Sequence, residues 1–514
     1  MDKPIKKIVI VGGGSAGWLT AGVLAAEHKV AQQQSLEITL VESPNVKTIG
    51  VGEGTWPSMR NTLDKIGITE LEFIQQCDAS FKQGSKFINW QTGKDGEFYY
   101  HPFMTPEGYS QIDLQKHWQA THSQQAFADT INAQYHTCEM GLAPKQIATP
   151  PYAAVTNYGY HLNAGKFATL LQKHCTKKLA VKHLVAHIER IVSSPSGDIE
   201  KLATQDGQTI EGDLFIDCSG SVGLLINKHF NIPLIKQDNI LFNDCALATQ
   251  VPYFQQNNIA SATLSTAQTS GWIWDIGLPS RRGVGHTYSS AHISDAEAEQ
   301  QLRQYIASSI GDEESEKLSV RKLAFMPGYR EKFWHKNCVA VGMSAGFIEP
   351  LEASALAMIE LSITMISEQL PQTRQQMDIT AKRFNSRFSY RWQRVIEFLK
   401  LHYVLSQRRD SDYWRDNQQT VSIPDRLAEL IELWKYQPPS RYDFIENEEV
   451  FPSASYQYVL YGMGYHTQSH QHQTLFENNK IAEQLFAKVQ LQKQQFQQGL
   501  PTNRALINHY CQQQ

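Results

Sequence analysis

Residues 6–17 read KKIVIVGGGSAG, a β-branched run followed directly by a cluster of glycines. A short apolar run of this kind predicts a buried β-strand, and the Ala/Leu-rich stretch behind the glycines predicts a helix. Residues 36–42, LEITLVE, form a second apolar run that ends in an acidic residue. The three segments together predict a strand–helix–strand unit and therefore an α/β, Rossmann-type fold.

The glycines satisfy the pattern GxGxxG as Gly12, Gly14 and Gly17. The first permits a tight turn, the second lets the backbone approach a pyrophosphate, and the third allows the helix to pack closely on the strand. The pyrophosphate would then lie on the helix N-terminus, where amide donors and the helix dipole favour negative charge. Glu42, at the end of the second strand, would accept hydrogen bonds from the ribose hydroxyls.

Two further loops favour FAD over NAD as the dinucleotide. Asp217–Gly220 (DCSG) and Gly342–Gly346 (GMSAG) each follow another apolar run. Such Gly/Ser loops at strand ends resemble those of FAD-dependent monooxygenase-like folds, where they touch the cofactor. Because long stretches separate these strands in the chain, we expect the flavin domain to be non-contiguous.

Composition excludes several other classes of protein. The 514 residues carry a net charge of −4, with 47 basic and 51 acidic side chains, which gives no electrostatic case for nucleic acid or an anionic membrane. No apolar stretch of about 18 residues is present, and the N-terminal run is too short for a signal peptide, so we expect a cytoplasmic protein. The seven scattered cysteines contain no CxxC pair and predict reduced structural thiols rather than disulfides. We expect no metal site, and we assign His466, His470 and His472 to a solvated loop.

Beyond the dinucleotide signature, the chain resembles the flavin-dependent tryptophan halogenase family from Ile8 to about Tyr465. The resemblance is carried by six segments: GGGSAGW (12–18), VGEGTWPS (51–58), ASFKQGSKFINW (79–90), FYYHPF (98–103), GWIWDI (271–276) and GFIEPLEASA (346–355).

The resemblance implies a catalytic pair, Lys82 and Glu352. FADH2, O2 and chloride or bromide would yield hypohalous acid, HOX, for electrophilic halogenation of an electron-rich aromatic such as tryptophan or an indole derivative. Lys82 would either polarise HOX by a hydrogen bond or form a haloamine, and both routes stay open. Glu352 would act as a general base on the cationic adduct or help to polarise HOX.

The same resemblance implies the remaining site residues. His101 and Phe103 would flank the substrate ring, Phe451 and Tyr456 would line its pocket, and the Trp272/Trp274 pair would separate substrate from flavin along the tunnel for HOX. The backbone amides of Ser354 and Ala355 would hold the halide. The expected FAD contacts are Gly12, Gly14, Ser15, Ala16, Gly17, Glu42, Gly50, Val51, Gly52, Glu53, Asp217, Gly220, Met343, Gly346 and Leu351.

Three departures from the family pattern affect these expectations. The proline of the WxWxIP signature is displaced, since the chain continues Ile276-Gly277-Leu278-Pro279. The family's Glu-Ser-Thr-Gly stretch reads Glu352-Ala353-Ser354-Ala355, and we expect Ala355 to restrict a positive φ that glycine would allow, which puts the halide site in question. The C-terminal part matches poorly and offers no secure partner for an ammonium and a carboxylate. Free tryptophan is therefore one candidate substrate beside indole, larger indole derivatives and phenols.

We expect residues 1–385 to form an FAD-binding box with inserted substrate segments, and residues 386–514 to form a mainly helical region that closes the substrate pocket. No second dinucleotide fingerprint is present, so FADH2 would come from a separate flavin reductase; a homodimer follows from the family resemblance only. Two alternatives stay open. An FAD-dependent aromatic monooxygenase would need neither Lys82 nor the tryptophan pair, and a non-catalytic flavin-binding module would have no use for a lysine and a glutamate in one cavity.

Overall fold

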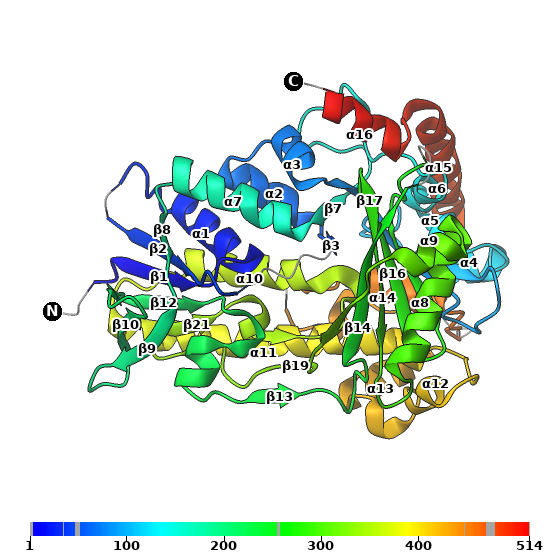
Figure 1. Cartoon of the computed structure of the whole chain (residues 1–514). Coiled ribbons are helices and arrows are strands. Elements are labelled where there is room, and N and C mark those ends of the chain that lie inside the picture. Colours follow the sequence, from blue (N-terminus) through cyan, green and yellow to red (C-terminus); the bar gives the residue numbers. More distant parts are fainter. Residues whose placement is uncertain are drawn as a thin grey trace. The chain divides into compact units, whose positions relative to one another are not determined.

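The computed structural model describes the whole chain except residues 1–3, 34, 47–51, 254–256, 447, 469–478 and 513–514. Its contacts define two compact units, each built from three segments (Figure 1). Unit 1 comprises Met1–Ala79, Leu162–Gln237 and Met326–Trp392, and unit 2 comprises Ser80–His161, Asp238–Phe325 and Gln393–Gln514. The boundary expected at residue 385 divides the chain by role, into a cofactor-binding part and a part that closes the substrate pocket. That division by role stays a prediction.

Unit 1 is built on a six-stranded sheet in the order β20-β21-β12-β1-β2-β8. Its strands are β1 (Lys7–Val11), β2 (Glu37–Glu42), β8 (Lys182–Val185), β12 (Leu214–Asp217), β20 (Trp334–His335) and β21 (Cys338–Ala340). All neighbours are parallel except the β20–β21 pair. The side chains of Ile8, Val9 and Ile10 are at most 1% exposed, as expected for a parallel strand covered on both faces. The predicted α/β Rossmann-type fold is confirmed.

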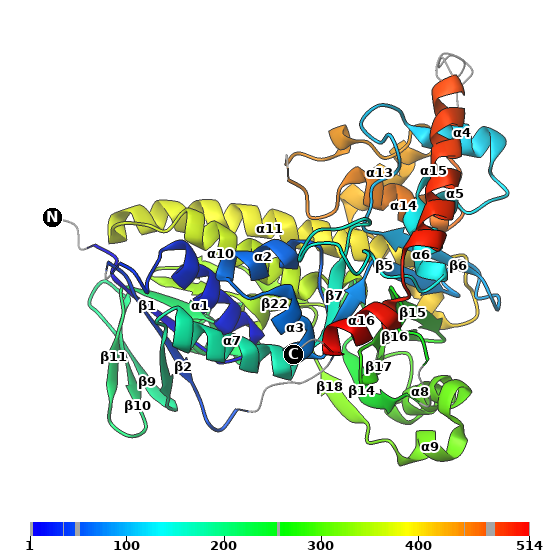
Figure 2. The same ribbon diagram turned by 90° about the horizontal axis from the view of Figure 1, so that it is seen from above.

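Helices pack around this sheet. They are α1 (Ser15–Glu27), α2 (Ser58–Ile66), α3 (Glu70–Cys77), α7 (Ala164–Lys178) and α10 (Ser354–Glu368). The α1 helix packs against α2, α7 and α10, which explains why Gly17–Ala25 is buried throughout. A small antiparallel sheet of β9 (Ile188–Ser193), β10 (Ile199–Thr204) and β11 (Thr209–Glu211) lies beside β1 (Figure 2). A hairpin turn at Asp206-Gly207 joins β10 to β11, with φ +84° at Gly207.

Short elements complete unit 1. They are β3 (Gly52–Gly54), β13 (Leu234–Lys236), β19 (Gly328–Arg330), β22 (Gly346–Phe347), and the helical turns Gly220–Val222, Leu224–His229, Gly342–Ser344 and Leu351–Ala353.

Unit 2 contains a seven-stranded sheet in the order β18-β14-β17-β16-β15-β5-β6. Its strands are β5 (Gly84–Ile88), β6 (Phe98–Pro102), β14 (Cys245–Pro252), β15 (Thr263–Gln268), β16 (Gly271–Gly277), β17 (Arg281–Tyr288) and β18 (Arg321–Ala324). Apart from the parallel β5–β15 pair, neighbours are antiparallel. Ile273 and Val284 pack with Leu302 and Ile306 of α8 (Asp295–Ile310). Because side chains alternate along a strand, Trp272 and Trp274 point to the face of β16 opposite Ile273.

The C-terminal region is mainly helical, as predicted. It contains α11 (Arg374–Val404), which begins in unit 1 and continues into unit 2, then α12 (Asp412–Asp416), α13 (Asp425–Trp434), α14 (Ser453–Gly462), α15 (Asn479–Gly499) and α16 (Asn503–Gln512). Unit 2 also holds β4 (Ser80–Lys82), α4 (Leu114–Thr121), α5 (Phe127–Ile131), α6 (Ala133–Glu139), α9 (Asp312–Lys317) and the start of β7 (Gly159–Asn163). Within the described ranges, no helix is long and apolar enough to cross a membrane.

Candidate active site

Three loops meet at the carboxyl edge of the unit 1 sheet, where β1, β12 and β21 run side by side. Gly12 has φ +118°, and a Cβ added there would lie 2.2 Å from the carbonyl oxygen of Cys218. Gly342 has φ +74°, and its added Cβ would lie 2.8 Å from Cβ of Ala16. The loops after the three strands therefore touch through positions that only glycine fits. In open α/β sheets the ligand crevice lies at this edge.

At the N-terminus of α1, Gly17 packs tightly against protein backbone, whereas Gly14 has free space beside it. An added Cβ at Gly17 would lie 1.9 Å from the Gly12 carbonyl oxygen, whereas added Cβ atoms at Gly14 and Gly220 would meet no protein atom within 4 Å. Gly14 is the N-cap of α1 and makes no side-chain cap bond, so the first helical amides have no partner within the helix. This cradle, which begins with Ser15 and Ala16, fits the diphosphate of FAD.

Glu42 lies beside the glycine loop, as the sequence predicted. A Cβ added at Gly13 would fall 2.2 Å from the Glu42 carboxyl carbon. The carboxylate is 3.1 Å from Nε2 of His183, and its side chain is 29% exposed. An accessible carboxylate at the end of β2 suits a ribose diol.

Asp217 is fully buried and shapes the loop that carries Gly220. One carboxylate oxygen accepts from the amide and hydroxyl of Ser219, at 3.0 and 2.5 Å. The other accepts from the amides of Leu225 and Ile226, each at 2.8 Å. Both oxygens are bound by the protein itself, so Asp217 would serve a cofactor by fixing the loop.

Met343 is half-buried in the turn that touches α1. The neighbouring Ser344 hydroxyl donates to the backbone carbonyl of Asp217 and ties this turn to β12. A Cβ at Gly346 would lie 2.7 Å from the Gly328 carbonyl oxygen, and Leu351 is fully buried. The turn after β21 is therefore tied to β12 through Ser344, and Gly346 packs closely against Gly328 of β19.

The predicted flavin loop is described from Gly52 onward, and Gly50 and Val51 lie outside the described residues. Gly52 and Glu53 are half-buried on β3. Burial raises the pKa of Glu53 to about 7. Further along, the Trp56 indole N–H donates to the carbonyl oxygen of Glu352 at 2.8 Å, a contact that the sequence did not reveal.

Glu352 is buried and has a left-handed backbone, with φ +64°. Ala353 follows with φ +54° and is the N-cap of α10. Ala355 lies inside α10 and is not among the residues with positive φ. The expectation that Ala355 restricts a required positive φ is therefore wrong. The reason is that α10 begins at Ser354, so residue 355 takes ordinary helical dihedrals that alanine adopts readily.

The N-terminus of α10 has no side-chain cap, because Ala353 occupies the N-cap position. The amides of Ser354 and Ala355 belong to the first turn, where helical amides lack a partner within the helix. The positive end of the helix dipole adds to this preference for an anion. The predicted halide residues thus lie where a halide ion would be stabilised.

A buried carboxylate joins α10 to α2. Glu360 accepts from the Ser58 hydroxyl at 2.9 Å and from the Thr62 hydroxyl at 2.5 Å. Burial raises the pKa of Glu360 to about 7, against these two hydrogen bonds, which lower it. No sequence pattern indicated this residue, because a glutamate in a helix is usually exposed.

In unit 2, Lys82 is the last residue of β4 and its side chain is 0% exposed. Its ammonium lies 5.4 Å from the centroid of the Phe103 ring. The backbone around it is anchored, because the Gln83 amide donates to the Ser261 carbonyl at 2.7 Å and the Phe103 amide donates to the Gln83 carbonyl at 3.0 Å. In the β4–β7 pair, Gly159 lies directly opposite Lys82.

His161 shares the Lys82 face of this strand pair, since it lies opposite Ser80, two residues before Lys82. Its Nε2 is 2.8 Å from the Thr263 hydroxyl. Burial, and secondly the Lys82 charge, hold the pKa of His161 well below its usual value. The lysine therefore has a neutral imidazole as its neighbour, which the sequence did not reveal.

Three of the four predicted substrate residues gather around Phe398 of α11. Phe398 stacks on Phe451 with a centroid separation of 3.8 Å and meets Tyr456 edge-on at 4.9 Å. The His101 ring lies 5.6 Å from Phe398, and its Nε2 is 2.9 Å from the Ser455 hydroxyl. The fourth residue, Phe103, is half-buried just beyond β6.

Trp272 and Trp274 are both buried, with ring centroids 6.3 Å apart. Trp272 lies 6.3 Å from Trp90, and Trp274 lies across Gly285 of β17, where an added Cβ would be 2.1 Å from the indole. The pair is therefore held rigidly in an aromatic layer of unit 2. Its predicted role beside the flavin stays a prediction.

A comparison with known proteins identifies the family. The family model described as tryptophan halogenase matches residues 7–477. The chain belongs to the tryptophan halogenase family. This halogenase is 51% identical to the tryptophan halogenase from Shewanella frigidimarina, with a TM-score of 0.96 over 99% of this chain and 98% of that one.

Two more distant relatives agree with this result. The tryptophan 6-halogenase SttH of Streptomyces toxytricini is 32% identical over 89% of each chain. The flavin-dependent halogenase BrvH from Brevundimonas sp. BAL3 is 29% identical, with a TM-score of 0.86 over 98% of this chain and 99% of that one. The halogenase is thus an enzyme, and flavin-dependent halogenation, predicted from the motifs, is confirmed as its class of activity.

A charged network of the halogenase lies next to Tyr456. Glu397 binds Arg394 at 2.6 Å and Arg426 at 2.7 Å, one arginine on each carboxylate oxygen. All three charges act on the Tyr456 hydroxyl, although burial dominates and raises its pKa. The sequence had suggested no partner for a charged substrate group, and the structure places these three charges near Tyr456.

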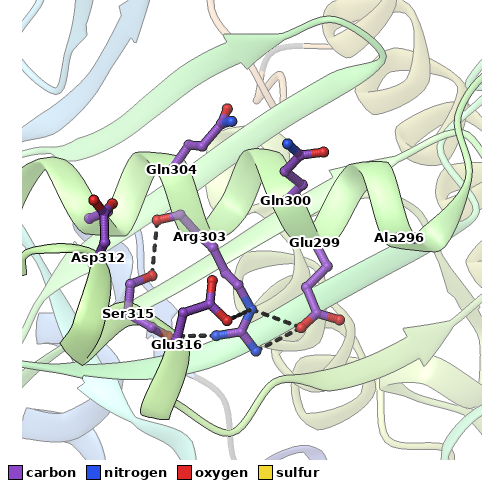
Figure 3. A pocket seen from close by; sticks show the side chains of 9 residues that line it. Ala296, Glu299, Gln300, Arg303, Gln304, Asp312, Ser315 and Glu316 are labelled. Carbon is purple, nitrogen blue, oxygen red and sulfur yellow. Dashed lines mark hydrogen bonds and ion pairs between the residues drawn. The ribbon is translucent and has the colours of Figure 1, made fainter.

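Other surface features of the halogenase lie apart from the predicted residues. A cavity of about 420 Å³ between α8 and α9 is lined by Arg303, Glu299 and Ser315 among others, and Arg303 is bound there by Glu299 at 2.7 Å (Figure 3). None of the predicted site residues lines it. Over the described ranges, no three His, Cys, Asp or Glu side chains could hold a metal ion; His466 contacts Gln119, and His470 and His472 lie outside these ranges.

Two alanine substitutions in the glycine cradle should separate an effect on stability from an effect on FAD binding. We expect Gly17→Ala to lower the Tm of the apo-protein, because its Cβ collides with the Gly12 carbonyl. We expect Gly14→Ala to leave that Tm unchanged, because its Cβ meets no protein atom, yet to weaken FAD binding at least about tenfold by occupying the phosphate position. Thermal melts and FAD titration measure both effects. Wild-type FAD affinity in Gly14→Ala would show that the diphosphate binds elsewhere.

Glu360 predicts a pH-dependent stability. Burial makes the folded state favour the neutral Glu360 carboxyl. Ionisation therefore does not reduce the free energy of unfolding of the wild type below pH 4.5, the ordinary pKa, and reduces it fully above about pH 7. Glu360→Gln should therefore gain stability over the wild type as pH rises from 5 to 8, by on the order of 3 kcal/mol. Melts at both pH values measure this, with exposed Glu200→Gln as control. A difference in Tm independent of pH would contradict the assignment.

Proposed function

We propose that this halogenase converts FADH2, O2 and a chloride or bromide ion into HOX, which Lys82 and Glu352 direct onto an electron-rich aromatic ring. The observation that supports the proposal most strongly is Lys82, a fully buried amine 5.4 Å from the Phe103 ring centroid. A hydroxylase or a non-catalytic flavin module would have no use for a buried amine facing an aromatic side chain.

The residues of unit 1 fit FAD. The diphosphate would bind at the start of α1 between Gly12 and Gly17, the ribose at Glu42, and the rest along the loops of Gly220 and Met343. When bound and reduced, the cofactor supplies the two electrons that let O2 oxidise halide to HOX. The first-turn amides of α10, at Ser354 and Ala355, would hold the halide.

The transfer step balances as HOX + Ar–H → Ar–X + H2O. Lys82 would either donate a hydrogen bond to the HOX oxygen and polarise the O–X bond, or form an N–X bond with release of water and then pass the halogen on. In both routes the arene proton goes to the Glu352 carboxylate. Lys82 belongs to unit 2 and Glu352 to unit 1, so their cooperation is itself part of the proposal.

We propose an indole as the substrate, with free tryptophan as the first candidate. Support comes from the aromatic cluster of His101, Phe398, Phe451 and Tyr456, which suits a flat ring. The relative SttH is named as a tryptophan 6-halogenase. The charged network beside Tyr456 is largely engaged internally, so indoles without an amino-acid group belong in the same test.

Supply of FADH2 by a separate, diffusible reductase and a cytoplasmic location are further parts of this proposal. The seven cysteines are free, as a reducing compartment would require. A homodimer stays an expectation from the family.

Lys82→Met tests the amine. With FADH2 supplied by a reductase and with bromide or chloride, we expect halogenation of an indole and phenol panel to fall by about 10²–10⁴-fold while FAD affinity persists. Lys145→Met is the matched control, because Lys145 is equally buried and lies 5.6 Å from the Tyr158 ring centroid. Hydroxylated product without a halide requirement would instead support the monooxygenase.

Glu352→Gln tests the base. It keeps the size of the side chain but cannot take up the arene proton, so we expect kcat to fall about 10²-fold or more with little change in KM. Glu349→Gln makes the same chemical change three residues away and should stay near wild-type activity. Equal activities of the two variants would remove Glu352 from the mechanism.

A further inference from the structure

Trp56 links the flavin loop to the predicted base. The residue is half-buried between β3 and α2, and its indole N–H donates to the carbonyl oxygen of Glu352 at 2.8 Å. Nearly 300 residues separate the two in the chain, yet both belong to unit 1. The bond reaches the backbone carbonyl of Glu352, so it acts on the peptide rather than on the side chain.

That peptide is conformationally demanding. Glu352 has φ +64° and ψ 5°, and Ala353 has φ +54° and ψ 42°. Two successive non-glycine residues in the left-handed region are rare, because the Cβ atom crowds the backbone there. The plane of the 352–353 peptide fixes ψ of Glu352 and φ of Ala353 together. A donor on its carbonyl oxygen therefore sets the direction in which the Glu352 side chain leaves the backbone.

A second tie holds the same two segments together. Glu360, two turns further along α10, accepts from Ser58 and Thr62 of α2. These bonds do not involve the indole. Removing the indole N–H alone would thus leave α2 attached to α10 and confine the change to the loop and the 352–353 peptide.

We propose that Trp56 is a positioning residue, whose indole N–H holds the Glu352 peptide in its left-handed conformation and so aims the Glu352 carboxylate. The inference rests on the proposed role of Glu352 as the base. The Trp56 loop also carries Gly52 and Glu53, which we expect to contact the flavin. One short loop would therefore serve both the cofactor and the base.

Trp56→Phe tests the inference, because it keeps an aromatic ring and removes only the donor. We expect kcat of halogenation to fall about tenfold, with FAD affinity within about twofold of wild type. The matched control is Trp334→Phe, since Trp334 is a buried tryptophan of unit 1 whose indole N–H has no hydrogen-bond partner in the described part of the chain. That control should retain wild-type kcat.

A double-variant cycle separates positioning from general stability. If Trp56 acts through Glu352, Trp56→Phe should slow the wild type about tenfold but leave Glu352→Gln unchanged. An equal slowing in both backgrounds, or no slowing in the wild type, overturns the inference. Trp56→Tyr, which restores a donor, should recover part of the loss, and Trp56→Leu, which also lacks the donor, replaces Trp56→Phe in the cycle if that variant does not fold. Full activity of Glu352→Gln would instead overturn the proposed base, a result distinct from failure of the Trp56 step.

Discussion

Direct contact between backbone atoms at the first strand–helix turn is the constraint on which unit 1 depends. Gly12 and Gly17 approach each other and the Cys218 carbonyl so closely that no side chain fits. This contact lets α1 start immediately above the sheet, with its first amides directed outward. It also brings the loops after β12 and β21 against the same turn. A cofactor crevice at this edge is thus a consequence of glycine sterics rather than of any single ligand contact.

Unit 2 buries the side chain of a lysine completely, at Lys82. Moving an ammonium out of water is costly unless polar groups surround it, so a fully buried lysine is seldom retained for packing alone. Lys82 ends a short strand paired with β7, and backbone hydrogen bonds to Ser261 and Phe103 anchor the next residue, Gln83. His161 stays neutral beside it, which avoids a second buried cation. The proposed chemistry with HOX would use such an anchored, buried amine.

The strain in unit 1 lies at Glu352 and Ala353. Comparing motifs position by position assigned the unusual backbone to residue 355, because the family has glycine there. In the structure, the unusual backbone lies just before α10 begins. Glu352 and Ala353 are in the left-handed region, and the residues from Ser354 onward are helical. A glycine-to-alanine change inside a helix is tolerated, and the amides proposed to hold the halide keep helical geometry without the glycine.

The sequence alone determined the Rossmann unit and the glycines of its first turn, and it predicted Glu42, Lys82 and Glu352 as site residues, because these inferences depend on local periodicity and on motifs of a few residues. The long stretches between its apolar runs also predicted a non-contiguous domain, and unit 1 is indeed built from three segments. Only the tertiary structure showed His161 beside Lys82, Phe398 between His101 and Phe451, Trp56 on Glu352, and the carboxylate of Glu360 between two helices. Each of these contacts joins segments far apart in the chain. Such contacts depend on side-chain directions after packing, and they leave no pattern in the order of residues.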